Sequence, residues 1–221
     1  LGGTVGAALH LRKRIPVQGG LGGGSSDAAG TIRLLERLWG HELRTETRWR
    51  VAAALGADIP FFLTGGTARG RGRGDRIEPL PPLAEQSLVL GLPPFGVPTA
   101  DAFREVHARL TLPGIGVSLP RLSAHKWPGE KDFSFAANDL ELVVFPRYPE
   151  LRRFRDALLS AGARVALLSG SGSTLFGVFD DGPAALDGAA RLGRGFPAWN
   201  VVPTRTVDRP AGEPDDAGGD G

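Results

Sequence analysis

The sequence predicts an α+β protein, and three features of the chain carry that prediction. An alternating segment at residues 8–15 leads into a glycine-rich loop and then into a helical pattern, so the chain begins as strand, loop, helix. The run Pro79–Pro82 marks a boundary, because adjacent prolines continue neither a helix nor a sheet ladder. Beyond it, segments follow in the order β, α, β, β, α, β, which is typical of a ferredoxin-like layer.

The segments before the boundary are two helices and a glycine-punctuated stretch. Apolar residues at helical spacing predict helices over residues 25–39 and 45–55, each followed by a glycine. Residues 65–77 read GGTARGRGRGDRI, which also resembles a nucleic-acid-binding arginine–glycine segment. Because the segment is short and Asp75 and Glu78 follow closely, we favour an edge strand or hairpin with arginines in solvent.

The segments after the boundary give the second domain. Strands are predicted at 87–92, 165–168, 175–179 and 198–202, and helices at 99–110, 149–161 and 184–192. From about residue 209 the chain is rich in Pro, Gly, Asp and Glu without an apolar anchor, which predicts a disordered tail over 209–221. The 221 residues suffice for one large domain or two small ones, and we place domains at 1–80 and 81–208.

Composition narrows the function. The chain is 41% hydrophobic and 23% charged, as in ordinary globular proteins, and no apolar run approaches the roughly 18 residues of a membrane span. Zero cysteines exclude disulfides and thiolate metal sites and are compatible with the cytoplasm, where we expect the protein. A net charge of +2 does not indicate a nucleic-acid partner. The chain contains no methionine and opens at Leu1, so we expect an N-terminal portion to be missing.

The glycine-rich loop is the strongest functional signal. Five glycines in six positions let backbone N–H groups close around a ligand, and the helix behind the loop offers the positive end of its dipole to a phosphate. A tight turn before a core helix is the alternative, although such a turn needs only one or two glycines. The predicted phosphate-binding residues are Pro16, Val17, Gln18, Gly19, Gly20, Leu21, Gly22, Gly23, Gly24, Ser25 and Ser26. The hydroxyl of Ser25 or Ser26 could touch Mg²⁺, with Ser26 the named candidate.

Three further positions are candidates for the acceptor side of a phosphoryl transfer. Asp58 stands at a loop-to-element junction where a carboxylate can reach a cleft as a base, although an aspartate two residues before a proline is equally an ordinary helix initiator. The turn Ser169, Gly170, Ser171 and Gly172 allows close backbone approach, although such a turn is more often a plain hairpin. Phe103 could stack on a base or lie in the core.

These motifs together resemble the GHMP kinases (galactose, homoserine, mevalonate and phosphomevalonate kinases). The loop reads Pro-x-x-x-Gly-Leu-Gly-x-x-Ser-Ser-x-Ala from Pro16, Gly56–Phe62 reads Gly-Ala-Asp-x-Pro-Phe-Phe, and Leu168–Gly172 reads Leu-Ser-Gly-Ser-Gly. The triple glycine and the segment Phe135–Glu141, with its Asn-Asp-Leu-Glu, are similar to members that phosphorylate the 2-hydroxyl of a cytidylyl sugar alcohol in non-mevalonate isoprenoid biosynthesis.

The resemblance implies a two-domain kinase fold, with a ribosomal protein S5 domain 2-like N-terminal domain, incomplete here, and a ferredoxin-like C-terminal domain. It implies ATP and Mg²⁺, Asp58 as catalytic base, Ser169–Gly172 lining the site and Phe103 against the cytosine ring. The family's lysine-bearing first motif is absent from residues 1–15, and Lys13 does not take that lysine's role. Two alternatives stay open, another GHMP small-molecule kinase of the mevalonate or homoserine type, and an inactive nucleotide-binding fragment.

Overall fold

The computed structural model describes residues 6–110 and 136–207, and the chain divides into two compact units. The first unit contains Leu1–Pro16 and Gly22–Pro82, and the second contains Val17–Leu21 and Leu83–Val207. The predicted tail from residue 209 and Phe135 lie outside the described residues. The glycine-rich loop thus belongs partly to each unit, whereas the sequence placed all of it in a domain spanning residues 1–80.

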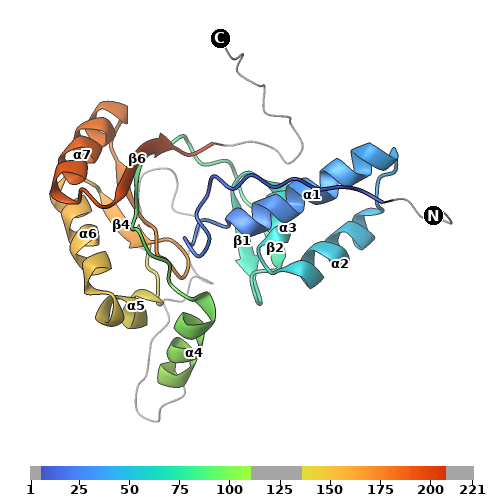
Figure 1. The fold of residues 1–221 in the computed structure, drawn as a ribbon, viewed down its shortest axis with the longest axis horizontal. Helices are drawn as coiled ribbons and strands as arrows, with labels where there is room; N and C mark the ends of the chain where they lie inside the picture. Colours follow the sequence, from blue (N-terminus) through green and yellow to red (C-terminus); the bar gives the residue numbers. More distant parts are fainter. Residues whose placement is uncertain (1–5, 111–135, 208–221) are drawn as a thin grey trace. The chain divides into compact units, whose positions relative to one another are not determined.

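The first unit is built of three helices and a hairpin (Figure 1). These elements are α1 (Gly23–Trp39), α2 (Thr45–Leu55), α3 (Ile59–Thr64), β1 (Ala68–Arg71) and β2 (Arg76–Pro79). A small apolar core of Ala29, Ile32, Ala52 and Ile59 joins the helices. Arg33 of α1 ties α3 in place, since its guanidinium donates to the carbonyls of Phe62 and Leu63, each at 3.0 Å, at the end of α3 where carbonyls lack helical partners.

The hairpin predicted from the arginine–glycine segment is confirmed, because β1 and β2 pair antiparallel. Two arginines of the hairpin bond to neighbouring carboxylates. Arg71 Nε donates to Glu78 at 2.9 Å and Arg73 to Asp75 at 3.0 Å. These bonds hold the pKa of Glu78 and that of Asp75 below their ordinary values. Local pairing of this kind favours a solvated hairpin over a phosphate-binding arginine segment.

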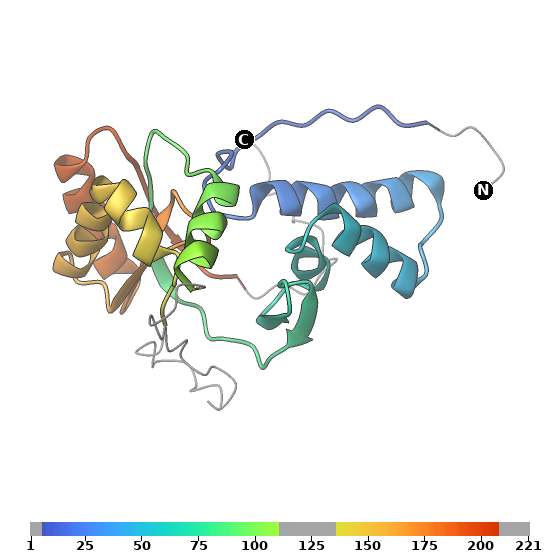
Figure 2. The ribbon, with the colours of Figure 1, turned by 90° about the horizontal axis from the view of Figure 1, so that it is seen from below.

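The strand predicted over residues 8–15 is wrong. The segment is extended but belongs to no β-ladder, and Leu9 and Leu11 are 64% and 62% exposed. Figure 2 draws it as a trace without an arrow. A strand needs a neighbour to receive its N–H and C=O groups, and no other segment of the described residues provides one. The following helix α1 ends at Trp39 with Gly40 as its C-cap, as predicted, but it begins at Gly23, two residues earlier than expected.

The second unit is a four-stranded sheet with helices on one face (Figure 1). The strands are β3 (Ser87–Leu92), β4 (Val165–Leu168), β5 (Leu175–Phe179) and β6 (Asn200–Arg205), and the helices α6 (Pro149–Ser160) and α7 (Gly182–Gly195). The sheet order is β4-β5-β3-β6 with every neighbour antiparallel. α6 packs on β4 and β5, and α7 packs on β3 and β6. The chain order β3, α6, β4, β5, α7, β6 confirms the ferredoxin-like prediction.

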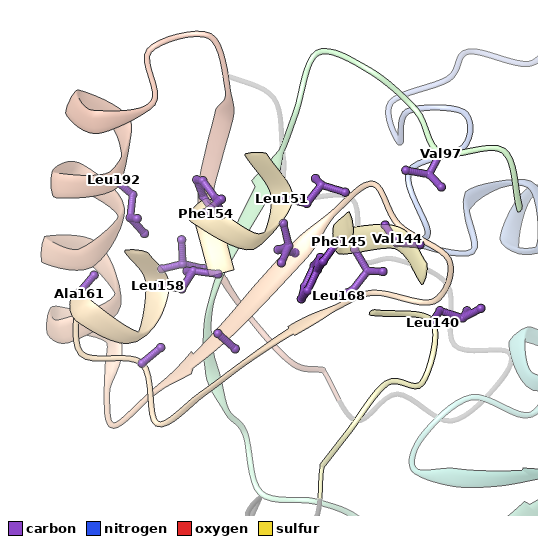
Figure 3. Close-up of a cluster of buried hydrophobic side chains, with 14 of the residues drawn as sticks. Val97, Leu140, Val144, Phe145, Leu151, Phe154, Leu158, Ala161, Leu168 and Leu192 are labelled. Carbon is purple, nitrogen blue, oxygen red and sulfur yellow. The ribbon is translucent and has the colours of Figure 1, made fainter. Parts of the chain in front are cut away.

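Two further helices, α4 (Thr99–Leu110) and α5 (Glu141–Arg147), complete the second unit, and α5 packs against both α4 and α6. Figure 3 shows the apolar side chains that α5, α6 and α7 contribute to its core. Phe154 is fully buried and stacks on Trp199, with ring centroids 4.2 Å apart. No helix in the described part of the chain is long and apolar enough to cross a membrane.

Candidate functional site

The N-terminus of α1 has the properties of a phosphate site. Gly22 is the N-cap residue in the left-handed conformation (φ 65°), and the Ser26 N–H donates to its carbonyl at 2.9 Å. Within the described residues, the N–H groups of Gly23, Gly24 and Ser25 donate to no other group. Free amides at the positive end of a 17-residue helix are the donors that a phosphate oxygen requires.

The space around this first turn is closed on one side and open on the other. A Cβ at Gly22 would lie 2.6 Å from the Phe62 ring, and a Cβ at Gly23 would lie 2.8 Å from the Ile15 side chain. At Gly24, in contrast, no described atom lies within 4 Å of a Cβ once the adjacent residues and the backbone of the same helix are set aside. The first turn of α1 is therefore packed at Gly22 and Gly23 and open at Gly24.

The serines of the loop differ in their engagement. Ser26 Oγ donates to the carbonyl of Gly23 at 2.9 Å, whereas the described structure gives the Ser25 hydroxyl no partner. No group of three or more His, Cys, Asp or Glu side chains in the described residues could hold a metal ion. The role of Ser26 in metal binding stays a prediction.

Lys13 forms an ion pair with Asp27 in the first turn of α1. Its ammonium also lies 3.4 Å from the position of a Cβ on Gly23. The pair neutralises the Asp27 carboxylate, and the two side chains are 30% and 31% exposed. Lys13 therefore contacts α1.

Asp58 is an unengaged carboxylate in the same unit. It occupies the N-cap position of α3, yet its side chain accepts no capping bond, and the residue is exposed. A Cβ at Gly74, in the turn of the hairpin, would lie 3.9 Å from Asp58 Oδ1. Because the carboxylate does not cap α3, the helix-initiator explanation does not account for it, and its role as a base stays a prediction.

The first half of the glycine loop is held by the turn between β4 and β5. Within the second unit, Ser169 Oγ donates to Gly20 O at 2.9 Å and the Thr174 N–H to Gly19 O at 3.0 Å. The Ser173 N–H donates to the carbonyl of Gln18 at 3.2 Å. The Leu-Ser-Gly-Ser-Gly segment is thus a hairpin turn, as its composition favours, and it also seats residues 18–20 of the loop.

The close contact between the loop and this turn requires a glycine at position 20. Its φ is +74°, and a Cβ there would lie 2.0 Å from Ser169 O and 2.9 Å from Gly172 O. Neither backbone oxygen can withdraw without breaking the turn. This glycine is therefore explained by packing of protein on protein, in contrast to Gly24.

Phe103 is solvent-facing, with 58% of its surface exposed, so it does not lie in the core. It stands one helical turn beyond Thr99, whose Oγ1 is 2.8 Å from Ser171 Oγ. The ring thus projects from a helix whose first turn is bonded to the glycine turn. Its contact with a cytosine ring stays a prediction.

Two residues without an assigned role in the sequence analysis also contact the turn. Asn138 Nδ2 donates to the carbonyls of Leu168 (2.8 Å) and Gly170 (2.7 Å), and Glu141 Oε1 accepts from the Leu168 N–H at 2.8 Å. Burial raises the pKa of Glu141, although the bond from the Leu168 N–H and the charge of Arg155 act in the opposite direction. Their place in the Asn-Asp-Leu-Glu segment was the only sequence signal.

The predicted site residues therefore fall into two sets, each held within one unit. Gly22–Ser26 and Asp58 belong to the first unit, and Val17–Leu21, Phe103 and Ser169–Gly172 belong to the second. Pro16, the first residue of the predicted loop, lies at the end of the first unit's opening segment.

Comparisons with known proteins point to one family. Residues 1–66 match the family described as GHMP kinases N terminal domain, and residues 118–198 match GHMP kinases C terminal. A 4-diphosphocytidyl-2-C-methyl-D-erythritol kinase from Rhizobium etli is 38% identical over 90% of this chain and 66% of the relative. The kinase of the same name from Moorella thermoacetica is 40% identical over 93% of this chain and 72% of the relative.

The crystal structure of a 4-(cytidine 5'-diphospho)-2C-methyl-D-erythritol kinase superposes with a TM-score of 0.66 at 35% identity, covering 87% of this chain and 68% of that one. The chain therefore spans about two thirds of the length of these relatives. Both halves of the family's pattern are present in order, and the identity extends across most of the chain. The chain belongs to the GHMP kinases, in the group of the 4-diphosphocytidyl-2-C-methyl-D-erythritol kinases.

Proposed function

We propose that a protein containing this chain transfers the γ-phosphoryl group of ATP to the 2-hydroxyl of 4-diphosphocytidyl-2-C-methyl-D-erythritol, a step of non-mevalonate isoprenoid biosynthesis. The observation that carries the proposal is the presence, within one unit, of both free amides at the start of α1 and the unengaged carboxylate of Asp58. The relatives' names supply the acceptor, since kinases so named are 38% and 40% identical to this chain.

Each group of the chain has a part in such a reaction. The N–H groups of Gly23, Gly24 and Ser25 would bind phosphate oxygens and stabilise the charge that develops on the transferring group. Asp58 would orient the acceptor hydroxyl and take its proton as it attacks phosphorus. Mg²⁺, when bound, supplies further neutralisation of phosphate charge. The use of ATP favours the cytoplasm, the location expected from the sequence.

The test compares Asp58→Asn with the parent protein, in the chain extended by the lysine-bearing first motif that the family resemblance places ahead of the loop. We expect kcat to fall by about 10²–10⁴, the range for loss of a general base, with ATP affinity changed by less than about twofold. Asp187→Asn is the matched control, because Asp187 pairs with Arg191 on α7 at 2.9 Å, in the other unit. Near-normal turnover by Asp58→Asn would remove Asp58 from the mechanism.

The acceptor is tested by comparing kcat/KM for the cytidylyl substrate, mevalonate and homoserine. A higher value for either small acceptor would replace the acceptor proposed here while keeping the kinase. ATP binding without turnover by the 221-residue chain, with turnover restored by the extension, would favour a fragment over lost function. Absence of turnover from the extended protein with all three acceptors would contradict the proposed function.

A further inference from the structure

The edge of the sheet next to the glycine turn is completed by side chains. β4 is an edge strand, paired with β5 on one side only. At its last residue, Leu168, the outward N–H donates to Glu141 Oε1 at 2.8 Å and the carbonyl accepts from Asn138 Nδ2 at 2.8 Å. The backbone N–H and C=O of Leu168 therefore have side-chain partners. In the interior of a sheet, a neighbouring strand would provide these partners.

Asn138 uses every hydrogen-bonding group of its amide. Nδ2 donates twice, to Leu168 O and to Gly170 O at 2.7 Å, and Oδ1 accepts from the Leu140 N–H at 3.0 Å. Gly170 has a φ of +55°, and its carbonyl direction is fixed by the Asn138 bond. An amide with two donors and one acceptor is the side chain that meets this demand, because a carboxylate has no donor for the carbonyls.

The turn that Asn138 and Glu141 contact also binds the first half of the glycine-rich loop. Ser169, between the two carbonyls that Asn138 binds, donates its hydroxyl to Gly20 O at 2.9 Å. A Cβ on Gly20 would meet Ser169 O at 2.0 Å, so the loop lies directly on the turn's backbone. A displacement of Leu168–Gly170 therefore moves Gly19 and Gly20 with it. All of these contacts lie within the second unit.

We propose that Asn138 and Glu141 are positioning residues for the nucleotide, which hold the first half of the phosphate loop in its binding conformation through the turn at Leu168–Gly170. The inference rests on the proposed function only in taking the loop as the ATP site. Neither residue touches ATP. Without these side chains the loop can adopt other conformations. The apparent ATP affinity then falls in proportion to the fraction of molecules whose loop keeps the binding-competent conformation.

The experiment measures ATP affinity of the 221-residue chain by isothermal titration calorimetry, together with hydrogen exchange of residues 169–174. Asn138→Ala is expected to weaken ATP binding about tenfold, equal to about 1.4 kcal/mol, and to speed amide exchange at Ser173 and Thr174. Asn200→Ala is the matched control, because Asn200 is the only other asparagine and is exposed on β6. Its ATP affinity should stay within about twofold of the parent's.

Glutamate variants separate positioning from general stability. Glu141→Gln keeps the acceptor for the Leu168 N–H and should bind ATP like the parent, whereas Glu141→Ala should bind it several-fold more weakly. If Asn138→Ala does not fold, Ser169→Ala cuts the same path at its far end and should weaken ATP binding in the same direction. Unchanged ATP affinity in Asn138→Ala, Glu141→Ala and Ser169→Ala, with only a lower melting temperature, would overturn the proposal.

The calorimetry and the hydrogen-exchange measurements need ATP but no acceptor. Their outcome therefore tests the positioning role separately from the proposed reaction. Weaker ATP binding in Asn138→Ala together with no phosphorylation of any acceptor would sustain the positioning role and reject the reaction. Normal phosphorylation of the cytidylyl substrate by the extended protein, with an ATP KM unchanged in Asn138→Ala, would reject the positioning role alone. A parent chain that binds no ATP would overturn the inference, since there would be no site for the turn to support.

Discussion

Adding one methyl group at two positions of the glycine loop should have opposite consequences. Gly20 has a φ of +74°, and a Cβ there would lie 2.0 Å from Ser169 O. A side chain in the left-handed region costs about 1–2 kcal/mol, and forced overpacking costs typically about 1–3 kcal/mol more. Gly20→Ala should therefore destabilise the second unit by about 2–5 kcal/mol, since the atoms in the way are backbone and cannot rotate aside.

Gly24→Ala adds the same methyl at the first turn of α1, where no described atom lies within 4 Å of it. Alanine is a better helix former than glycine by up to about 1 kcal/mol, so this variant should be as stable as the parent or slightly more stable. The methyl is added to the turn whose free amides we propose as the phosphate site. ATP binding should therefore weaken while the fold is kept.

Thermal unfolding followed by circular dichroism measures the first effect, and ATP titration measures the second. At roughly 2–4 °C per kcal/mol for a chain of this size, Gly20→Ala should melt several degrees or more below the parent. Equal melting of Gly20→Ala and parent would show that the loop does not lie on the Ser169 carbonyl. Unchanged ATP affinity in Gly24→Ala would remove the α1 N-terminus from the phosphate site.

Two further predictions concern Glu141 and the core. Burial raises the folded-state pKa of Glu141 above its ordinary 4.5, so its stabilising contribution is present below that value and is lost as pH rises through the raised pKa. The free energy of unfolding of Glu141→Gln should therefore increase relative to that of the parent as the pH rises through this range. Urea unfolding at several pH values measures the difference between the two proteins, and a difference that does not change with pH would contradict this prediction. Phe154→Ala should lower the free energy of unfolding by about 3–5 kcal/mol, because the ring is fully buried against Trp199. Phe103→Ala should change it by less than about 0.5 kcal/mol, because that ring is exposed. Equal urea midpoints for the two variants would contradict the assignment of Phe154 to the core.

The spacing of apolar residues along the chain was sufficient to predict most of the helices and the strands of the second unit. The bounds of α2 and the end of α1 agree with the sequence, and the ferredoxin-like order follows from the succession of short segments after Pro82. The segment 8–15 failed because alternation is necessary for a strand but does not provide the neighbour that completes it. The start of α1 was displaced because a left-handed glycine, and not a serine, occupies the N-cap.

The contacts that organise the turn could not be predicted, because they join residues far apart in the chain. Asn138 and Gly170 are 32 positions apart, and Ser169 and Gly20 are 149 apart. No spacing rule relates such residues, and sequence reasoning assigned the turn to a ligand and not to the loop. Asp58 could be proposed because its motif is local, and its role as a base stays a prediction; the structure adds that the carboxylate does not cap α3.

The glycines of the loop answer several demands, and only some of these concern a ligand. Packing explains Gly20 against Ser169 and Gly22 against Phe62, since a side chain on either would strike a neighbour. Gly24 meets nothing, so protein packing gives no reason for the missing side chain there. A count of glycines therefore overstates the size of a phosphate cradle. Gly30 on the same helix is equally open, so the lack of packing at Gly24 does not by itself locate a ligand, and the ATP titration of Gly24→Ala is the measurement that tests this position.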